Sequence, residues 1–202
     1  MILASFYTQV FYEEVAEKYI ISSATKVEVG LYRYKVPSLH NWKKNTALKA
    51  RCILDLINLY NDDVTMIDAD ATFEKYPDLL FNIPKDYDIA YHELEWDYFW
   101  HGRKGNKREL CTGTIMFRNS LISKQLLITW MEENEKNPNI LEQKNLQNLL
   151  EREYSGANKI NIYYLPIEYC AIVHKDGNLP PFIKDPVIKH NQISRISKRM
   201  EL

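Results

Sequence analysis

The chain has 202 residues, which is enough for one domain with a sizeable core or for two small ones. Its 26 basic and 27 acidic residues nearly cancel, so the composition gives no reason to expect nucleic acid or an anionic membrane as a partner. No apolar run approaches the roughly 20 residues of a membrane-spanning helix. Residues 1–8 read as a core strand rather than a secretory signal, so a cytoplasmic protein is expected.

Apolar periodicity predicts strands and helices that alternate along the chain. In chain order we expect a strand at 2–7, a helix at 10–23, a strand at 26–34, a helix at 42–60, strands at 64–67, 88–92 and 115–117, a helix that follows Ser120 and runs to about Glu133, a helix at 141–152, and strands at 160–165 and 169–173. A β-α-β-α-β start is typical of doubly wound folds. We therefore expect the α/β class, with a single domain over 1–202 and a mostly parallel central sheet covered by helices on both faces.

Three cysteines are scattered along the chain, and none has the close spacing of metal ligands. Cys52, Cys111 and Cys170 each lie in an apolar context. We expect them to be buried free thiols, which fits a reducing compartment.

Two acids follow the apolar strand at 64–67 and are the most informative feature of the sequence. If the strand extends through both, Asp68 and Asp70 lie on the same face, because side chains alternate along a strand. Two ionised carboxylates near a buried strand end repel each other, and a divalent cation would offset that repulsion. The pair therefore predicts a metal site at the carboxyl end of a strand, where open α/β sheets bind their ligands.

Residues 93–109 show little apolar periodicity and mix acids, bases and large aromatics. A long irregular segment inside a compact domain is more often a functional loop than an accident. Trp96 and Trp100 have the spacing of a stacking platform for a sugar, although a small buried contact is the alternative interpretation.

Five segments, in the right order, resemble the GT-A fold glycosyltransferases, which use nucleotide-diphospho-sugar donors. Those segments are 41–49, NWKKNTALK; 67–70, IDAD, followed by 77–81, PDLLF; 111–120, CTGTIMFRNS; Glu142-Gln143, where many relatives carry Asp-Gln; and 187–195, VIKHNQISR. The resemblance spans nearly the whole chain and implies a single Rossmann-like GT-A domain that transfers a sugar from a nucleotide diphosphate to a hydroxyl of a glycan or glycoprotein.

The resemblance also implies a metal cofactor with ligands from both halves of the chain. Asp70 would bind the cation directly, Asp68 would hold the ribose or a metal-bound water, and His190 would supply a nitrogen ligand. His174 is the competing histidine. Carboxylates suit Mg²⁺ or Mn²⁺, and one imidazole favours Mn²⁺.

Several residues are predicted to bind the donor. Arg195 is the preferred diphosphate contact because its guanidinium presents a fork of hydrogen-bonding N–H groups, and Lys49 is the second choice. The strand end at Tyr7 and Thr8 is expected to meet the nucleotide base, which the sequence leaves open between UDP-type and GDP-type donors. The remaining donor-binding predictions are Asp68, Thr112, Gly113 and Gln143.

Glu142 is the first candidate for a catalytic or sugar-binding group, and Asp97 in the irregular loop is the second candidate base. A glutamate at the start of a helix also complements the helix dipole without any catalytic role. The sequence predicts neither the acceptor nor the stereochemical outcome.

Two other functions remain open at this point. The DxDxT pattern at Asp68, Asp70 and Thr72 also matches haloacid-dehalogenase-like phosphohydrolases, where the first acid is a nucleophile. That class expects the motif near the N-terminus and a later acid pair, and neither is present. A non-catalytic nucleotide-sugar or glycan-binding module is the other alternative.

Overall fold

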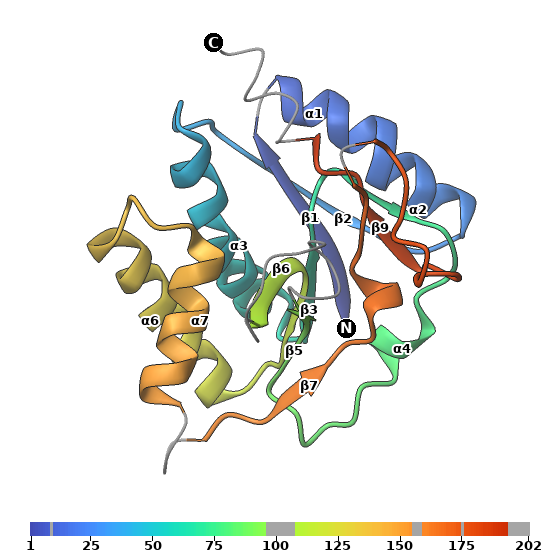
Figure 1. The fold of residues 1–202 in the computed structure, drawn as a ribbon. Coiled ribbons are helices and arrows are strands. Elements are labelled where there is room, and N and C mark those ends of the chain that lie inside the picture. Colours follow the sequence, from blue (N-terminus) through green and yellow to red (C-terminus); the bar gives the residue numbers. More distant parts are fainter. Residues whose placement is uncertain (9, 96–107, 155–158, 175, 194–202) are drawn as a thin grey trace.

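The computed structural model describes residues 1–8, 10–95, 108–154, 159–174 and 176–193 (Figure 1). Its central sheet has six strands in the order β2-β1-β3-β6-β5-β7. Their bounds are β1 Ile2–Thr8, β2 Tyr32–Val36, β3 Val64–Ile67, β5 Ile89–Glu95, β6 Arg108–Phe117 and β7 Ile162–Tyr164. The predicted α/β class is confirmed. Only β6 runs against its neighbours, so three of the five strand pairings are parallel.

Helices cover both faces of the sheet, as predicted (Figure 1). One face carries α3 Trp42–Tyr60, α6 Leu121–Lys136 and α7 Glu142–Glu153. The other carries the continuous helical run α1 Phe11–Ala16, η1 Glu17–Ile21 and α2 Ser22–Lys26, together with the short α4 Asp78–Phe81. Among the described residues, no helix combines the length and apolar character needed to cross a bilayer.

The strand sequences explain why both faces are covered. Successive residues of β3 and β6 are buried in alternate cores: Met66 and Ile115 pack under α3, whereas Ile67 and Met116 pack under the α1–α2 side. Strands that are buried on both faces read as continuous apolar runs, as the sequence does here.

The predicted strand at 26–34 is wrong over residues 26–31. The helical run continues to Lys26, and Glu28 then adopts a left-handed backbone with φ 57°. The Val29 N–H bonds the Ala24 carbonyl at 3.0 Å and the Glu28 N–H bonds the Thr25 carbonyl at 3.3 Å, which is a Schellman helix end. The apolar alternation at 26–29 therefore belongs to a helix terminus, and the strand begins only at Tyr32.

A second, three-stranded sheet was not predicted. It has the order β4-β9-β8, with β4 Ala71–Phe73, β8 Ala171–Ile172 and β9 Ile188–His190. β9 pairs antiparallel with β4, so that Ala71 lies opposite His190, and parallel with β8. This small sheet joins the segment after the two acids to the last described strand of the chain.

Candidate functional site

The two acids lie in a turn rather than in an extended strand. β3 ends at Ile67, and the Ala71 N–H bonds the Asp68 carbonyl at 3.0 Å, which closes a turn over 68–71. The prediction that strand alternation places Asp68 and Asp70 on one face is therefore wrong in its mechanism. The carboxylates converge because the chain reverses between β3 and β4.

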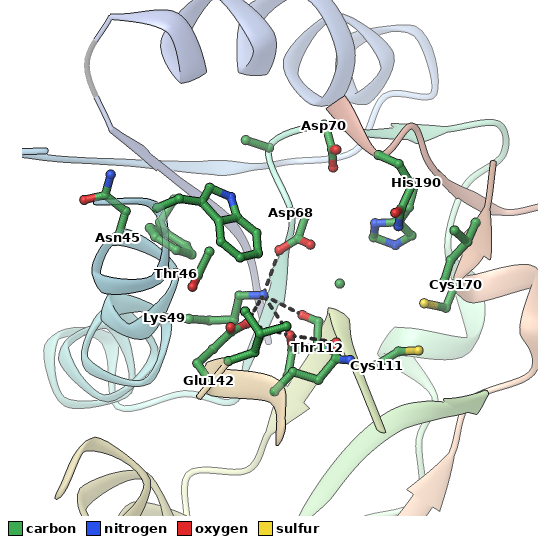
Figure 2. A pocket seen from close by; sticks show the side chains of 18 of the residues that line it. Asn45, Thr46, Lys49, Asp68, Asp70, Cys111, Thr112, Glu142, Cys170 and His190 are labelled. Atoms are coloured by element: carbon green, nitrogen blue, oxygen red, sulfur yellow. Dashed lines mark hydrogen bonds and ion pairs between the residues drawn. The ribbon is translucent and has the colours of Figure 1, made fainter. Parts of the chain in front are cut away.

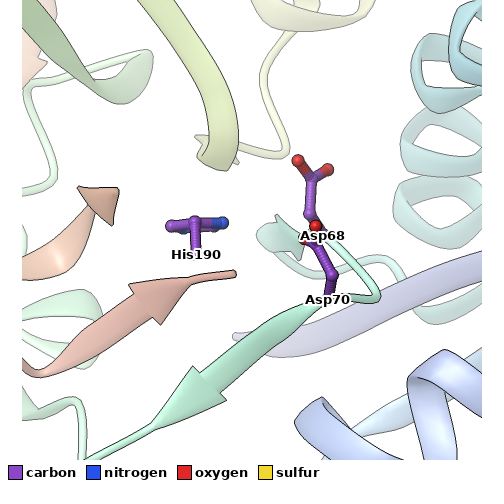
Figure 3. A group of neighbouring side chains, drawn as sticks. All are labelled: Asp68, Asp70 and His190. Carbon is purple, nitrogen blue, oxygen red and sulfur yellow. The ribbon is translucent and has the colours of Figure 1, made fainter. Parts of the chain in front are cut away.

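His190 joins these acids from the far end of the chain. One ligand atom from each of Asp68, Asp70 and His190 lies within 4.8 Å of the other two (Figure 3). The pairing of β4 with β9 brings the histidine there. This is the set of ligands proposed from the sequence, and His174 is not part of it.

Asp70 is tied to the segment that follows β9. Its Oδ2 accepts the Ile193 N–H at 2.8 Å, and its carbonyl accepts from the Asn191 amide at 2.7 Å. Burial and the charge of Asp68 raise the pKa of Asp70 to about 6, although the Ile193 N–H and Lys49 act in the opposite direction. The protein therefore compensates the negative charge of Asp68 and Asp70 only in part.

The imidazole of His190 is buried and neutral near pH 7. Its exposed fraction is 3%. Burial lowers the pKa of His190 to about 4, because a charged imidazole would lose its hydration. A neutral imidazole is the form that binds a metal ion.

Lys49 occupies the centre of a buried polar network on the other side of Asp68 (Figure 2). Its ammonium donates to Asp68 Oδ1 at 2.7 Å, to the Thr112 carbonyl at 2.9 Å and to the Thr112 hydroxyl at 3.2 Å. Glu142 Oε1 lies 3.7 Å from the same nitrogen. Burial acts to lower the pKa of Lys49, but the carboxylates of Asp68 and Glu142 outweigh it and raise the pKa, so the lysine stays charged.

The start of α7 is fixed to β6 by the same network. The Thr112 hydroxyl donates to Glu142 Oε1 at 3.0 Å, and the Thr112 N–H donates to Gln143 Oε1 at 3.2 Å. The Gln143 amide in turn donates to Glu109 Oε1 at 2.6 Å. The side chains of Glu142 and Gln143 therefore both contact β6.

A cavity of about 330 Å³ joins the acid–histidine cluster to this network. That volume lies at the lower end of the range for small-molecule sites. Every described residue that the sequence assigned to metal, donor or catalysis lines it: Tyr7, Thr8, Lys49, Asp68, Asp70, Thr112, Gly113, Glu142, Gln143 and His190. Asp97 and Arg195, and the pair Trp96 and Trp100, lie outside the described residues.

Other residues that line the cavity were not predicted from the sequence. Trp42, Asn45 and Thr46 lie in the first turns of α3 and line the cavity with Lys49. Their spacing of i, i+3, i+4 and i+7 is one face of a helix, so the choice of Lys49 already implied them. Glu109 was also missed, because its strand was expected to begin only at 115.

One wall of the cavity is apolar. It is formed by Leu94, Cys111, Cys170 and Ile172. The two cysteines are free thiols, as is Cys52, and all three are buried, which confirms the expectation from the sequence.

Solved structures with a similar fold include several glycosyltransferases. A glycosyltransferase involved in glycosylation of the major capsid of PBCV-1 matches with a TM-score of 0.67 and 10% identity over 100% of both chains. Mouse xyloside xylosyltransferase 1 matches with a TM-score of 0.55 and 8% identity over 96% of this chain and 98% of that one. The galactosyltransferase LgtC matches with a TM-score of 0.54 and 12% identity over 95% of this chain and 87% of that one. At these identities the likeness concerns the fold.

The sequence itself matches a family model. No curated protein matches it. The model of nucleotide-diphospho-sugar transferases, however, matches residues 22–200. That match covers most of the chain, and we conclude that the protein belongs to the nucleotide-diphospho-sugar transferase family and is a glycosyltransferase of the GT-A fold.

Proposed function

We propose that this glycosyltransferase depends on a divalent metal and moves a sugar from a UDP-type or GDP-type donor to a hydroxyl of a glycan or glycoprotein acceptor. The observation that carries the proposal is the convergence of Asp68, Asp70 and His190 within 4.8 Å at the wall of the cavity. The metal would be Mn²⁺ or Mg²⁺.

The three proposed ligands suit such a cation. Two carboxylates and one imidazole are hard and borderline ligands, and the imidazole favours Mn²⁺ over Mg²⁺. The raised pKa of Asp70 marks a carboxylate whose negative charge the protein leaves poorly compensated. When bound, the cation supplies Lewis-acid stabilisation to the diphosphate that leaves the sugar.

The chain's own residues would bind and orient the donor. Asp68 has one oxygen on Lys49, which leaves the other for the ribose or for a metal-bound water. Tyr7 and Thr8, at the end of β1, line the cavity where a nucleotide base would stack and form hydrogen bonds. Arg195 is the proposed diphosphate contact.

Glu142 and Gln143 would contact the donor sugar, together with Thr112 and Gly113. Glu142 is held by the Thr112 hydroxyl and lies beside Lys49, so its carboxylate has a fixed position in the cavity. A fixed carboxylate suits the binding of sugar hydroxyls, and it also suits general-base catalysis on the acceptor. Asp97 is the other proposed base.

A thermal-shift screen tests the proposal. The wild type, Asp70→Asn and a control, Asp86→Asn, are melted with Mn²⁺ and a panel of UDP and GDP sugars. Asp86 is exposed and does not line the cavity. A nucleotide at about 100 times its Kd should stabilise the folded state by about 2.7 kcal/mol, which corresponds to a rise in Tm of about 5–10 °C.

The wild type and Asp86→Asn should respond to the same nucleotide with Mn²⁺, and Asp70→Asn should not. An equal response of Asp70→Asn, or no response of the wild type to any pair, would show that the metal proposal is wrong. A donor assay follows on the responding nucleotide sugar. Stabilisation without release of nucleoside diphosphate, with or without sugar acceptors, would identify a binding module.

A further inference from the structure

The imidazole of His190 is held by two residues of β6. The Thr114 hydroxyl lies 3.0 Å from His190 Nε2, and the side chain of Thr114 is completely buried. Gly113 lies against the ring: a Cβ at this position would be 2.8 Å from Cε1 and 2.9 Å from Nδ1 of His190. Real side chains do not tolerate such contacts, so the ring can occupy its position only because residue 113 is a glycine.

Both β6 residues are themselves fixed by the sheet. Thr114 pairs with Ile67, the last residue of β3, and the Gly113 carbonyl accepts the Asp68 N–H at 2.8 Å. The segment that holds the imidazole therefore also holds the backbone of the first acid. The relative position of His190 and Asp68 is set by two neighbouring residues of one strand.

Thr114 does not line the cavity, whereas Thr112 and Gly113 do. Its hydroxyl thus acts on the site through His190 and not by contact with a donor. A neutral imidazole has one N–H and one lone pair, and a cation needs the lone pair. If Nε2 donates its proton to the Thr114 oxygen, Nδ1 is left with the lone pair, and a ring nitrogen of His190 is directed toward the two carboxylates (Figure 3).

We propose that Thr114 is a positioning residue of the metal site: it accepts a hydrogen bond from Nε2–H of His190, with Gly113 beneath the ring, and so presents Nδ1 to the cation. The inference rests on the proposed metal-dependent function. Hydroxyl, carbonyl and carboxylate partners of this kind fix the tautomer and orientation of ligating histidines, and their loss costs roughly 10–100-fold in metal affinity.

Three variants test the role of the hydroxyl. Thr114→Val removes it at nearly constant shape, Thr114→Ser retains it, and Thr65→Val makes the same change at a buried threonine of β3 that bonds Met1 Sδ instead. Binding of Mn²⁺ alone, and of Mn²⁺ with UDP or GDP, is followed by electron paramagnetic resonance of the free ion. Thr114→Val should bind Mn²⁺ about 10-fold more weakly or worse, and Thr114→Ser and Thr65→Val should bind as the wild type does.

A second measurement needs neither metal nor a variant. Nitrogen-15 spectra of histidine-labelled, metal-free wild type should show His190 with the proton on Nε2 and a bare Nδ1. A proton on Nδ1 would overturn the inference, as would wild-type Mn²⁺ affinity in a folded Thr114→Val. If the wild type binds no Mn²⁺ with any nucleoside diphosphate, the metal-dependent function itself fails, and the tautomer alone decides whether Thr114 orients the ring.

Discussion

The ammonium of Lys49 donates a hydrogen bond to Asp68 Oδ1 at 2.7 Å and donates its other hydrogen bonds to the carbonyl and hydroxyl of Thr112. A lysine ammonium has three donors, so none remains for a diphosphate unless an internal bond is broken. We interpret Lys49 in this structure as a counter-ion for Asp68 and Glu142. A direct contact with the donor would require the network to rearrange.

Lys49→Met should therefore destabilise the protein. The change removes the cation that Asp68 and the buried Glu142 share, and breaking a buried pair by removing one partner costs about 3–5 kcal/mol. Because the side chain of Asp68 is 39% exposed, we expect the lower end of that range. Urea unfolding measures the loss. Lys44→Met, at an exposed lysine of the same helix, is the control and should stay within about 0.5 kcal/mol of the wild type. An equally small effect of Lys49→Met would contradict the counter-ion role.

The metal-free protein should respond to pH through Asp70. The pKa of Asp70 is about 6 in the folded state and near 3.8 in a free side chain, so the folded state binds the proton more tightly. Stability therefore falls as pH rises from about 3.8 to about 6 and stays at the lower value above that range. Asp70→Asn should be more stable than the wild type at pH 7.5 in the absence of metal, and this advantage should shrink at pH 4.5. Chemical unfolding at both pH values checks it, and an advantage that is equal at both would refute the assignment.

Bound Mn²⁺ should offset the loss of stability that the ionised Asp70 causes. The cation needs an ionised Asp70 and a neutral His190, so protons compete with it. The rise in Tm produced by Mn²⁺ with a nucleoside diphosphate should be larger at pH 7.5 than at pH 5.0. Melting curves with and without Mn²⁺ at the two pH values measure it. A shift that does not depend on pH would mean that Asp70 is not a ligand.

His190→Ala should weaken the metal dependence of donor turnover. The expected result is a concentration of Mn²⁺ for half-maximal activity that is raised at least 10-fold, because one of three ligands is lost. His174→Ala is the matched control, since His174 lies outside the ligand group, and it should behave as the wild type does. The reverse ranking of the two variants would make His174 the ligand.

Glu142→Gln separates two roles for this carboxylate. The amide can still accept from Thr112, but it carries no charge. If Glu142 binds sugar hydroxyls, the KM for the donor should rise about 10-fold, the equivalent of one hydrogen bond to a charged group, with kcat nearly unchanged. We expect this outcome because the carboxylate is already engaged by Thr112 and lies near Lys49. A fall in kcat of about 100-fold or more at unchanged KM would instead identify a general base.

Elements with local signals were predicted well from the sequence. α3 has a long apolar stripe, a side-chain cap at Asn41 and a left-handed end at Asn61. β3 is a short apolar run between polar residues, and its four residues are buried as expected. Ser120 caps α6 by accepting the Ser123 N–H, and the helix begins directly after Ser120, as predicted. In these segments the neighbouring residues alone favour the observed structure.

The remaining features depend on contacts between distant segments. The Schellman end at Glu28 lacks the glycine that usually marks it. Each strand of the small sheet has only two or three residues, and β4 joins that sheet by pairing with β9 across more than half the chain. The candidate ligands were found because residue type and order suffice for that, whereas the approach of His190 to Asp68 and Asp70 requires the antiparallel pairing of β9 with β4.

The pairing of β4 with β9 has a consequence for biosynthesis. A ribosome releases the chain from its N-terminus, so both acids and the strands of the central sheet are translated before the last strand of the small sheet. Asn191, whose side-chain amide donates to the Asp70 carbonyl, lies 121 positions further along the chain than Asp70. A nascent polypeptide can thus acquire its main sheet and both covering layers while the proposed cation site still lacks the imidazole of His190. Competence for sugar transfer would then appear only when β9 has left the ribosomal tunnel and paired with β4.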